Sequence, residues 1–400
     1  MKTPFLKALP ILEQIEKAGF EAYFVGGSVR DFLLDRDIDD VDIATSATPD
    51  EVKEIFPKTV DVGISHGTVV VLYQGESYEV TTFRSESEYD DYRRPNEVTF
   101  IRSLEEDLRR RDFTMNAIAM TKSGEIIDPF SGQDAILQKV IKTVGNAEER
   151  FHEDALRIMR AVRFVSQLAF AIDDETYSAL ENHRQLLQHI AVERIATEFE
   201  KLLLGENYQA ALSILLETGI YEYLPRFQHK YEELATFSKI KLDPSFSIED
   251  YWVMILKHLN LKPSNVESFL RSWKQPIKLI RRVKRGLSWL EKRLHHHWNL
   301  VDLYKAESEI ALSTEKLYNL LTGHAVHTNI DELQKQLKSL PIKERSELQV
   351  SGQDLMEWFE LKGGPWIEDK LLEIERAVIV GETKNGKEAI REWLFRCNQY

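Results

Sequence analysis

The sequence predicts an α+β protein in which a head with a small mixed β-sheet precedes a long, all-helical arm. Short runs of β-branched and aromatic residues, bounded by glycines and charged residues, concentrate before about residue 145. After that point the apolar residues recur at intervals of three and four, which is the spacing of amphipathic helices. With 400 residues, 43% of them hydrophobic, the chain is long enough for two or three packed domains.

The predicted elements follow in chain order. We expect strands at residues 23–25, 41–43, 68–73 and 78–83, and a short helix at 32–34. In the second part, Leu156, Met159, Val162 and Val165 show helical spacing. Because strands are followed only by helices, we expect a mixed head with helical domains behind it. The predicted parts are a head (1–145), a helical neck (146–205), a helical body (206–310) and a helical tail (311–400).

Composition excludes several classes of protein. The 66 acidic residues outnumber the 52 Lys and Arg, and the net charge of −14 excludes a protein that coats nucleic acid through bulk charge. The single cysteine, Cys397, excludes an intrachain disulfide and a cysteine-based zinc site. No window approaches the roughly 18 apolar residues that span a bilayer. We therefore expect a cytoplasmic protein with no membrane partner.

A pair of glycines, Gly26 and Gly27, separates the first predicted strand from the helix that follows. Glycines let the backbone approach a ligand closely, and the free N–H groups of a helix N-terminus attract phosphate. Arg30 could direct a fork of hydrogen bonds to the same phosphates. A purely structural turn is the alternative for this pattern alone.

Two aspartates, Asp40 and Asp42, are predicted to lie on one face of the second strand. Side chains alternate along a strand, so Val41 and Ile43 would point into the core while the aspartates project together. Two such carboxylates repel each other unless a cation lies between them, and Mg²⁺ prefers one or two carboxylates plus phosphate oxygens. A solvated acidic edge is the alternative, but the preceding glycine turn favours a two-metal site for nucleotidyl transfer.

These motifs resemble a known family. The turn at residues 26–28 followed by Asp-Val-Asp at 40–42 resembles the signature of DNA polymerase β-like nucleotidyltransferases. The fuller string Gly-Gly-Ser-Val-Arg-Asp at 26–31 resembles the class II tRNA nucleotidyltransferases, the CCA-adding enzymes, and residues 109–117 and 153–164 resemble two further blocks of that family. The resemblance implies a polymerase β-like head, Mg²⁺ as cofactor, CTP and ATP as substrates, and tRNA as partner.

Residues 109–117 begin with three consecutive arginines. All three cannot face a core, so part of the cluster meets solvent or an anion, and a basic surface loop is the alternative. Asp112 and Asn116 lie one helical turn apart and could orient Arg111 or a ribose hydroxyl. The resemblance assigns contact with the incoming nucleotide to Arg111.

The segment 153–164 is predicted to form one helix with a charged side and an apolar side. At 100° per residue the charged side collects Glu153, Arg157, Arg160 and Arg163, with Asp154 at its edge. An exposed helix stabilised by Glu–Arg pairs is the alternative. Under the resemblance this helix selects the nucleotide.

A carboxylate and a guanidinium on this segment could distinguish bases without a template. Asp154 could accept a hydrogen bond from the amine of cytosine or adenine, while uracil and guanine present a carbonyl oxygen there, at a cost of about 1–3 kcal/mol. Arg157 could donate to the adjacent ring nitrogen. The resemblance assigns base selection to this pair, and Arg160 and Arg163 would lie towards the triphosphate or hold the pair in place.

Further segments refine the position within the family. Residues 84–95 resemble the flexible loop that CCA-adding enzymes have and CC-adding relatives lack, although a plain surface loop is an equal alternative. Residues 62–68 lack the Gly-Arg-Arg-Phe-type string of bacterial poly(A) polymerases, and His66 is read as a turn residue. Glu79, on the fourth predicted strand, is either a third catalytic carboxylate or an ordinary strand residue.

A basic cluster in the helical arm could bind RNA phosphates. It consists of Arg271, Lys274, Lys278, Arg281, Arg282, Lys284, Arg285, Lys292 and Arg293, against one acid, Glu291. Pairing with acidic neighbours is the alternative. Residues 340–343, 351–354 and 363–366 resemble the family's tail, which contacts the elbow of tRNA.

The sequence therefore predicts a CCA-adding enzyme that transfers C, C and A to the 3′ end of tRNA. Asp40 and Asp42 would hold two Mg²⁺, and Gly27, Arg30 and Arg111 would hold phosphates and ribose. A CC-adding, A-adding or poly(A)-adding relative, a transferase of small molecules, and a catalytically silent RNA-binding protein are the alternatives. The sequence does not decide between a monomer and a homodimer.

Overall fold

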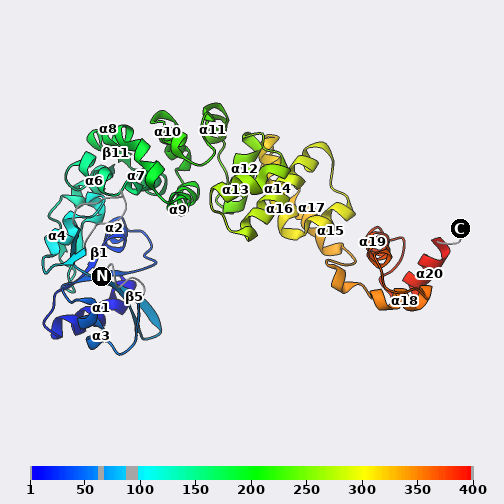
Figure 1. Cartoon of the computed structure of the whole chain (residues 1–400), viewed down its shortest axis with the longest axis horizontal. Coiled ribbons are helices and arrows are strands. Elements are labelled where there is room, and N and C mark those ends of the chain that lie inside the picture. The colour runs from blue at the N-terminus through cyan, green and yellow to red at the C-terminus, as the bar shows by residue number, and fades with distance from the viewer. Residues whose placement is uncertain (1, 62–66, 87–97, 398–400) are drawn as a thin grey trace. The chain divides into compact units, whose positions relative to one another are not determined.

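The computed structural model describes residues 2–61, 67–86 and 98–397, which form two compact units (Figure 1). The first unit comprises residues 1–240 with Ser272–Lys274, and the second comprises Lys241–Arg271 with Gln275–Tyr400. Residues 272–274 belong to the first unit because the buried Trp273 ring packs on Phe199 and Phe227, at centroid distances of 4.9 and 5.1 Å. The expected boundaries at 145, 205 and 310 stay a prediction, since these units divide near residue 240.

A seven-stranded mixed sheet forms the start of the first unit, in the order β3-β4-β5-β2-β1-β8-β9. Neighbouring strands are antiparallel except β2 and β5, which pair in parallel. The strands are β1 (Ala22–Val25), β2 (Asp42–Thr45), β3 (Thr59–Asp61), β4 (Thr68–Tyr73), β5 (Glu76–Thr82), β8 (Ala119–Met120) and β9 (Ile126–Ile127), and β6 (Arg84–Glu86) pairs separately with β7 (Val98–Phe100). All four predicted strand runs are confirmed, with small shifts at their ends.

Helices pack on both faces of this sheet. They are α1 (Thr3–Lys17), α2 (Gly27–Leu33), α3 (Pro49–Ile55), α4 (Leu104–Arg109) and α5 (Gly132–Gln138), with a 3₁₀ turn, η2 (Thr114–Asn116). Side chains of β1 alternate, so Phe24 packs on Phe5 of α1, with ring centroids 4.9 Å apart, while Val25 joins a cluster with Leu104 and Leu108 of α4. The sheet is thus fixed in register by two separate apolar layers.

The rest of the first unit is helical apart from one short pair of parallel strands, β10 (Val140–Ile141) and β11 (Ala171–Ile172). Its helices are α6 (Ala147–Glu153), α7 (Leu156–Leu168), α8 (Asp174–His183), α9 (Val192–Leu203), α10 (Tyr208–Glu217) and α11 (Tyr231–Ser238), with 3₁₀ segments η3 (Arg184–His189) and η4 (Ile220–Tyr223). The prediction of one unbroken helix over 153–164 is wrong, because two helices meet there. The prediction of helix 32–34 is also wrong in extent, since α2 already begins at Gly27.

The second unit contains only helices in its described part. They are α12 (Ile248–His258), α13 (Val266–Ser272), which runs into the first unit at its last residue, α14 (Ile277–His295), α15 (Leu300–Ala306), α16 (Ser308–Leu321), α17 (Ile330–Ser339), α18 (Gly352–Phe359), α19 (Trp366–Ile379) and α20 (Lys387–Cys397), with η5 (Pro263–Asn265) and η6 (Arg345–Glu347). Reciprocal Ser351–Asp354 hydrogen bonds form a capping box that starts α18.

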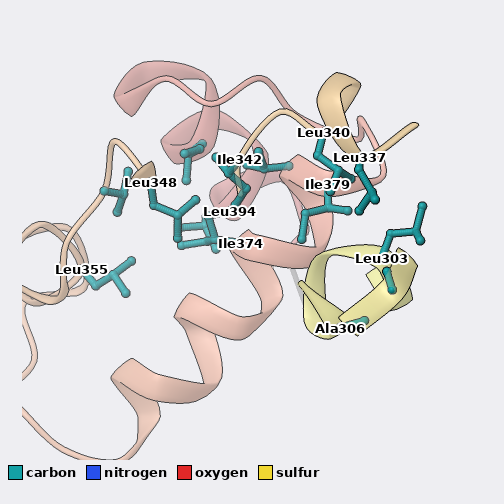
Figure 2. Close-up of a cluster of buried hydrophobic side chains, with 14 of the residues drawn as sticks. Leu303, Ala306, Leu337, Leu340, Ile342, Leu348, Leu355, Ile374, Ile379 and Leu394 are labelled. Atoms are coloured by element: carbon teal, nitrogen blue, oxygen red, sulfur yellow. The ribbon is translucent and has the colours of Figure 1, made fainter. Parts of the chain in front are cut away.

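Apolar side chains from the six helices α15 to α20 of the second unit contribute to the cluster in Figure 2. Leu303 lies on α15, Leu337 on α17, Ile374 on α19 and Leu394 on α20, and all four are at least 95% buried. This packing confirms the α+β class: a mixed sheet in the head, then a helical remainder. No helix within residues 2–61, 67–86 and 98–397 is long and apolar enough to cross a membrane.

Candidate active site

A cavity of about 890 Å³ opens in the first unit, at the ends of β1 and β2 and beside α7 and α9. All nine site residues predicted from the sequence line it: Gly27, Arg30, Asp40, Asp42, Arg111, Asp154, Arg157, Arg160 and Arg163. The fold therefore collects, in one place, residues from the glycine turn, the aspartate strand, the arginine block and the predicted selection helix. Their individual roles stay predictions.

The glycine turn lies against Asp42 because β1 and β2 are antiparallel. Val25, the last residue of β1, pairs with Asp42, the first residue of β2. Gly26 has a φ of +70°, and a Cβ on it would lie 3.1 Å from Arg111 Nη1 and 3.6 Å from Asp42 Oδ2. A side chain at position 26 would be both strained and crowded, so glycine keeps the backbone close to the carboxylate and the guanidinium.

Asp42 is the first residue of β2, and Asp40 precedes the strand, so the prediction of both aspartates within one strand is wrong in extent. Val41 and Ile43 are buried, while Asp40 is exposed and Asp42 is partly exposed towards the cavity. Glu79 lies beside Asp42, since the next residues, Ile43 and Val80, pair in parallel register. Burial raises the pKa of Asp42, the charges of Glu79 and Asp40 raise it further, and Arg111 lowers it.

This donor set fits a hard divalent cation. Carboxylate oxygens are the ligands that Mg²⁺ prefers, and a cation would relieve the repulsion that raises the pKa of Asp42. Within residues 2–61, 67–86 and 98–397, no three or more His, Cys, Asp or Glu side chains form a ready-made metal site. The remaining ligands would have to come from the substrate and from water.

Asp107 holds the arginine block in place. It is 1% exposed and accepts hydrogen bonds from Arg110 Nη2 at 2.8 Å and Arg111 Nη2 at 3.1 Å. Burial alone would raise the pKa of Asp107, but the charges of Arg111 and Arg110 more than offset this and lower it. Arg111 Nε is buried and has no hydrogen-bond partner among the described residues.

Asp154 lies at a helix break and not within a helix. Its φ of −135° and ψ of 99° are extended, α6 ends at Glu153, and α7 begins at Leu156. Asp154 Oδ1 accepts a hydrogen bond from the N–H of Leu156 at 3.0 Å. Aspartate offers the backbone this local alternative to helical bonding, which is why the unbroken helix was wrongly predicted. The break turns the carboxylate into the cavity.

Arg157 is held by acceptors on three sides. Its Nη1 donates to Glu153 Oε2 at 2.8 Å and to the carbonyl of Arg150 at 3.1 Å, and its Nη2 donates to the carbonyl of Arg110 at 2.8 Å. The side chain is only 9% exposed, yet it lines the cavity. A guanidinium carries five N–H donors, so two remain, on Nε and Nη2.

Arg160 and Arg163 each have a buried acidic partner. Arg160 Nε donates to Asp112 Oδ2 at 2.8 Å, and Arg163 forms an ion pair with Glu198 of α9. Asp112 also accepts from Asn116 Nδ2 at 3.0 Å, and Asn116 Oδ1 accepts from Arg30 Nη1 at 2.7 Å. A chain of hydrogen bonds thus joins α7 to the helix that follows the glycine turn.

Sequence reasoning missed the contribution of α9. Arg194, Glu198 and Lys201 lie on this helix; Arg194 and Lys201 line the cavity, and Glu198 pairs with Arg163 beside it. Their spacing of four and three places them on one helical face, a signal that the sequence did contain. The partners of Arg194 and Glu198, which are Asp154 and Arg163, lie 40 and 35 residues away in the sequence, so the pairing itself could not be read.

Three family models match the chain. The poly(A) polymerase head domain matches residues 22–142, and a putative domain 2 of tRNA nucleotidyltransferases matches 246–394. The model described as a probable RNA- and SrmB-binding site of polymerase A matches 169–231. The matched ranges cover the sheet, the following helices and the second unit.

Curated relatives match along the whole chain. A CCA-adding enzyme of Geobacillus sp. (strain WCH70) is 50% identical over 399 residues, which is 100% of this chain and 98% of that protein. The chain belongs to the CCA-adding enzymes. The CCA-adding enzyme of Bacillus cereus (strain AH187) is 48% identical over 394 residues, 98% of this chain and 99% of that protein.

Solved structures of CCA-adding enzymes share the fold. The Bacillus stearothermophilus CCA-adding enzyme in complex with CTP has a TM-score of 0.92 at 47% identity and covers 100% of this chain and 98% of that one. The Thermotoga maritima CCA-adding enzyme complexed with tRNA has a TM-score of 0.61 at 20% identity, covering 100% and 97%, and so shows the fold alone. The predicted resemblance, fold class and enzyme class are thereby confirmed.

Two segments used to distinguish CCA-adding enzymes from their sister families lie partly outside the described residues. These are 87–95 of the predicted loop, and 62–66 of the segment that contains His66. Their interpretations stay predictions.

Proposed function

We propose that this chain adds C, C and A to the 3′ end of tRNA without a template, using CTP and ATP and releasing pyrophosphate. The observation that carries the proposal is the convergence of all nine predicted site residues on one cavity, in a chain that matches CCA-adding enzymes over its full length. The single cysteine and a tRNA substrate fit the cytoplasm.

The reaction is an in-line transfer. The 3′-oxygen of the RNA forms a bond to the α-phosphorus while the bond from that phosphorus to the bridging oxygen breaks, and pyrophosphate leaves. Mg²⁺ is the cation that Asp40 and Asp42 would hold, and when bound it would lower the pKa of the attacking hydroxyl and offset triphosphate charge.

The chain's own residues orient the nucleotide. Arg30 uses three of its five N–H donors on Asp31 and Asn116, which leaves two for phosphate. Arg111, which lines the cavity, would reach the phosphates or the ribose, and Gly27 would let a phosphate approach the backbone closely. Asp154 and Arg157 would accept the amine and donate to the ring nitrogen of C or A.

The basic cluster of the arm contains cations with an acidic partner and cations that form no ion pair with described residues. Five of its nine members have acidic partners at 2.5–3.0 Å: Arg271 with Glu267, Arg282 with Glu309, Arg285 with Glu307, Lys292 with Asp302 and Arg293 with Glu315. Three exposed members of α14 form no ion pair with described residues: Lys278, Arg281 and Lys284. Spaced by three, these lie within about 120° of the helix circumference. We assign tRNA phosphate binding to this unpaired triad.

Neutralising the triad should weaken tRNA binding in a salt-dependent way. We expect the variant K278Q/R281Q/K284Q to reduce the slope of log K against log salt by about 2–3, because each neutralised phosphate contributes roughly 0.7–0.9. Fluorescence anisotropy with tRNA at several salt concentrations measures this slope. The matched control is R271Q. Arg271 is already paired with Glu267 at 2.7 Å, so its replacement should change the slope little. A triple variant with the wild-type slope would place the RNA elsewhere.

The intact mass of a tRNA transcript that lacks its last three nucleotides tests the function. After incubation with the protein, Mg²⁺ and all four nucleoside triphosphates, we expect a discrete gain of two C and one A. A gain of C-C alone, of one A on a C-C end, or of a ladder of A residues would assign a sister activity. No gain at all would contradict nucleotidyl transfer to tRNA.

A further inference from the structure

Arg194 contacts the carboxylate that the proposed function uses to read the base. It lies in the first turn of α9, and its Nη2 donates to Asp154 Oδ2 at 2.9 Å, with Nη1 at 3.5 Å from Oδ1. Both side chains line the cavity, with Arg194 30% and Asp154 19% exposed. This ion pair links two segments that are 40 residues apart in the sequence.

Asp154 needs such a contact because it lies at the break between α6 and α7. No helix fixes its backbone, and within its own segment its Oδ1 accepts the N–H of Leu156 at 3.0 Å. A second bond, on the other oxygen, prevents the carboxylate from turning about its last torsion. Each carboxylate oxygen has two acceptor sites, so both can be held in this way and still accept a base amine.

The same ion pair restrains a hydrogen-bond donor in the cavity. Uracil and guanine present a carbonyl oxygen where cytosine and adenine present an amine. Asp154 rejects that oxygen, since both groups are acceptors, but an unpaired guanidinium would bind it. While Arg194 is engaged with Asp154, the ion pair fixes the position of its guanidinium, and one N–H of Nη2 and one of Nη1 are used on the carboxylate.

We propose that Arg194 is a specificity-determining positioning residue, which aims the Asp154 carboxylate at the base and is itself kept by Asp154 from binding uracil or guanine. The proposal rests on the proposed function, since it assigns base reading to Asp154. A purely structural role for Arg194, joining α9 to the α6–α7 break, is the competing explanation. The two differ in what Arg194 does once Asp154 is removed.

A double-mutant cycle separates them. The variants are D154A, R194A and D154A/R194A, assayed by single-turnover addition of C, U, A or G to tRNA lacking its last three nucleotides or its last A. R194A should lower kcat/KM for CTP about tenfold, mainly through KM, because one bond to a charged group no longer fixes the carboxylate. D154A should raise the use of UTP relative to CTP, because the released Arg194 can donate to the uracil oxygen.

The decisive result is whether removing Arg194 lowers kcat/KM for UTP in each background. In the D154A background, removing Arg194 should lower kcat/KM for UTP about tenfold, because the released donor is then gone. In the wild-type background, R194A should not lower kcat/KM for UTP. A structural role would give the same loss for UTP and CTP in both backgrounds. R194K, which keeps the charge but not the fork, should restore part of the CTP activity.

A control variant, K201Q, and the wild type are assayed in the same way. K201Q removes a positive charge from the same cavity, two turns along α9, and leaves the Asp154–Arg194 pair in place, so it should not change the UTP-to-CTP ratio. Thermal unfolding of each variant shows whether it is folded. If the wild type adds C-C-A and rejects U and G while D154A and D154A/R194A use UTP equally, the proposal for Arg194 is overturned and the function stands. If the wild type adds nothing or does not discriminate, the proposed function itself fails.

Discussion

Replacing Asp42 with asparagine should lower the rate of nucleotide addition about 1,000-fold or more, because bound metal supplies several kcal/mol of transition-state stabilisation and each 1.36 kcal/mol is a factor of ten. Asp42 lies where the glycine turn, β2 and Arg111 meet. Asparagine keeps the shape of the side chain but offers one neutral oxygen to a cation. Single-turnover incorporation of CTP into tRNA measures the loss.

The same substitution should stabilise the protein in the absence of metal. Burial and the neighbouring charges of Glu79 and Asp40 raise the pKa of Asp42, which means that folding disfavours its ionised form. At neutral pH a neutral asparagine escapes this penalty, so urea unfolding of D42N without metal should give a higher free energy of unfolding than the wild type. An inactive but more stable variant would separate a lost metal ligand from a lost fold.

Glu125→Gln is the control for D42N. Glu125 is exposed in the turn before β9, and neutralising it should leave both activity and stability near the wild type. If D42N kept substantial activity in Mg²⁺, the assignment of Asp42 as a metal ligand would be wrong. If D42N lost activity and also had a lower free energy of unfolding than the wild type, the Asp42 carboxylate would be stabilising the fold.

The strands and the order of the site motifs were predictable because they depend on local patterns. A strand such as β4 is a run of β-branched residues between polar turns. The antiparallel pairing that brings Gly26 to Asp42 was not read from the sequence, but both residues were predicted to belong to one site. Local pattern plus motif order therefore identified nine residues of the cavity lining, but not Arg194 and Lys201 of α9.

The helix break at Asp154 was missed for a physical reason. Periodicity over 153–164 is genuinely helical, with apolar residues such as Ile158 and Met159 fully buried on one side. Two contacts of Asp154 accompany the break. One is the hydrogen bond from the N–H of Leu156, and the other is the ion pair with Arg194, which is distant in the sequence. A pattern averaged over a dozen residues does not register a bond made by one side chain.

The partners of the arginines were missed for a related reason. Arg160 and Arg163 were expected to lie towards the triphosphate or to hold the base-reading pair. The structure pairs them with Asp112 and Glu198, which lie 48 and 35 residues away in the sequence. Buried charges require partners, so the number of arginines predicts that acids must be nearby, but only the fold determines which acids these are.

Loss of the Asp112 carboxylate should destabilise the first unit. It is 8% exposed and accepts from the N–H of Phe113 at 2.8 Å, from Asn116 Nδ2 at 3.0 Å and from Arg160 Nε at 2.8 Å. Burial alone would raise the pKa of Asp112, but Arg160 and the hydrogen bond from Asn116 more than offset this and hold it well below its usual range. The ionised form is therefore the form that the fold requires.

Asp112→Asn should lower the free energy of unfolding by about 1–3 kcal/mol at pH 7, because it removes the counter-charge of Arg160, whose side chain is one-third exposed, and weakens the hydrogen bonds that the buried carboxylate accepts. The lowered pKa sets the pH dependence. The contribution of Asp112 is fully present above the pKa of an unfolded aspartate, about 3.9, and is lost as pH falls from there towards the lower folded value. The gap between wild type and D112N in urea unfolding should thus stay constant down to about pH 5 and shrink below about pH 4.

Glu105→Gln provides the comparison, because its ion pair with Arg109 is exposed on both sides, at 58% and 63%, and such pairs contribute about 0–1 kcal/mol. This variant should unfold close to the wild type at every pH. If D112N were no less stable than E105Q, or if the gap did not shrink in acid, the chain of hydrogen bonds from Arg160 through Asp112 and Asn116 to Arg30 would not be what holds α7 against the glycine turn. If the gap behaves as expected while CTP incorporation also falls, the same buried carboxylate supports both the fold and the position of the arginines that line the cavity.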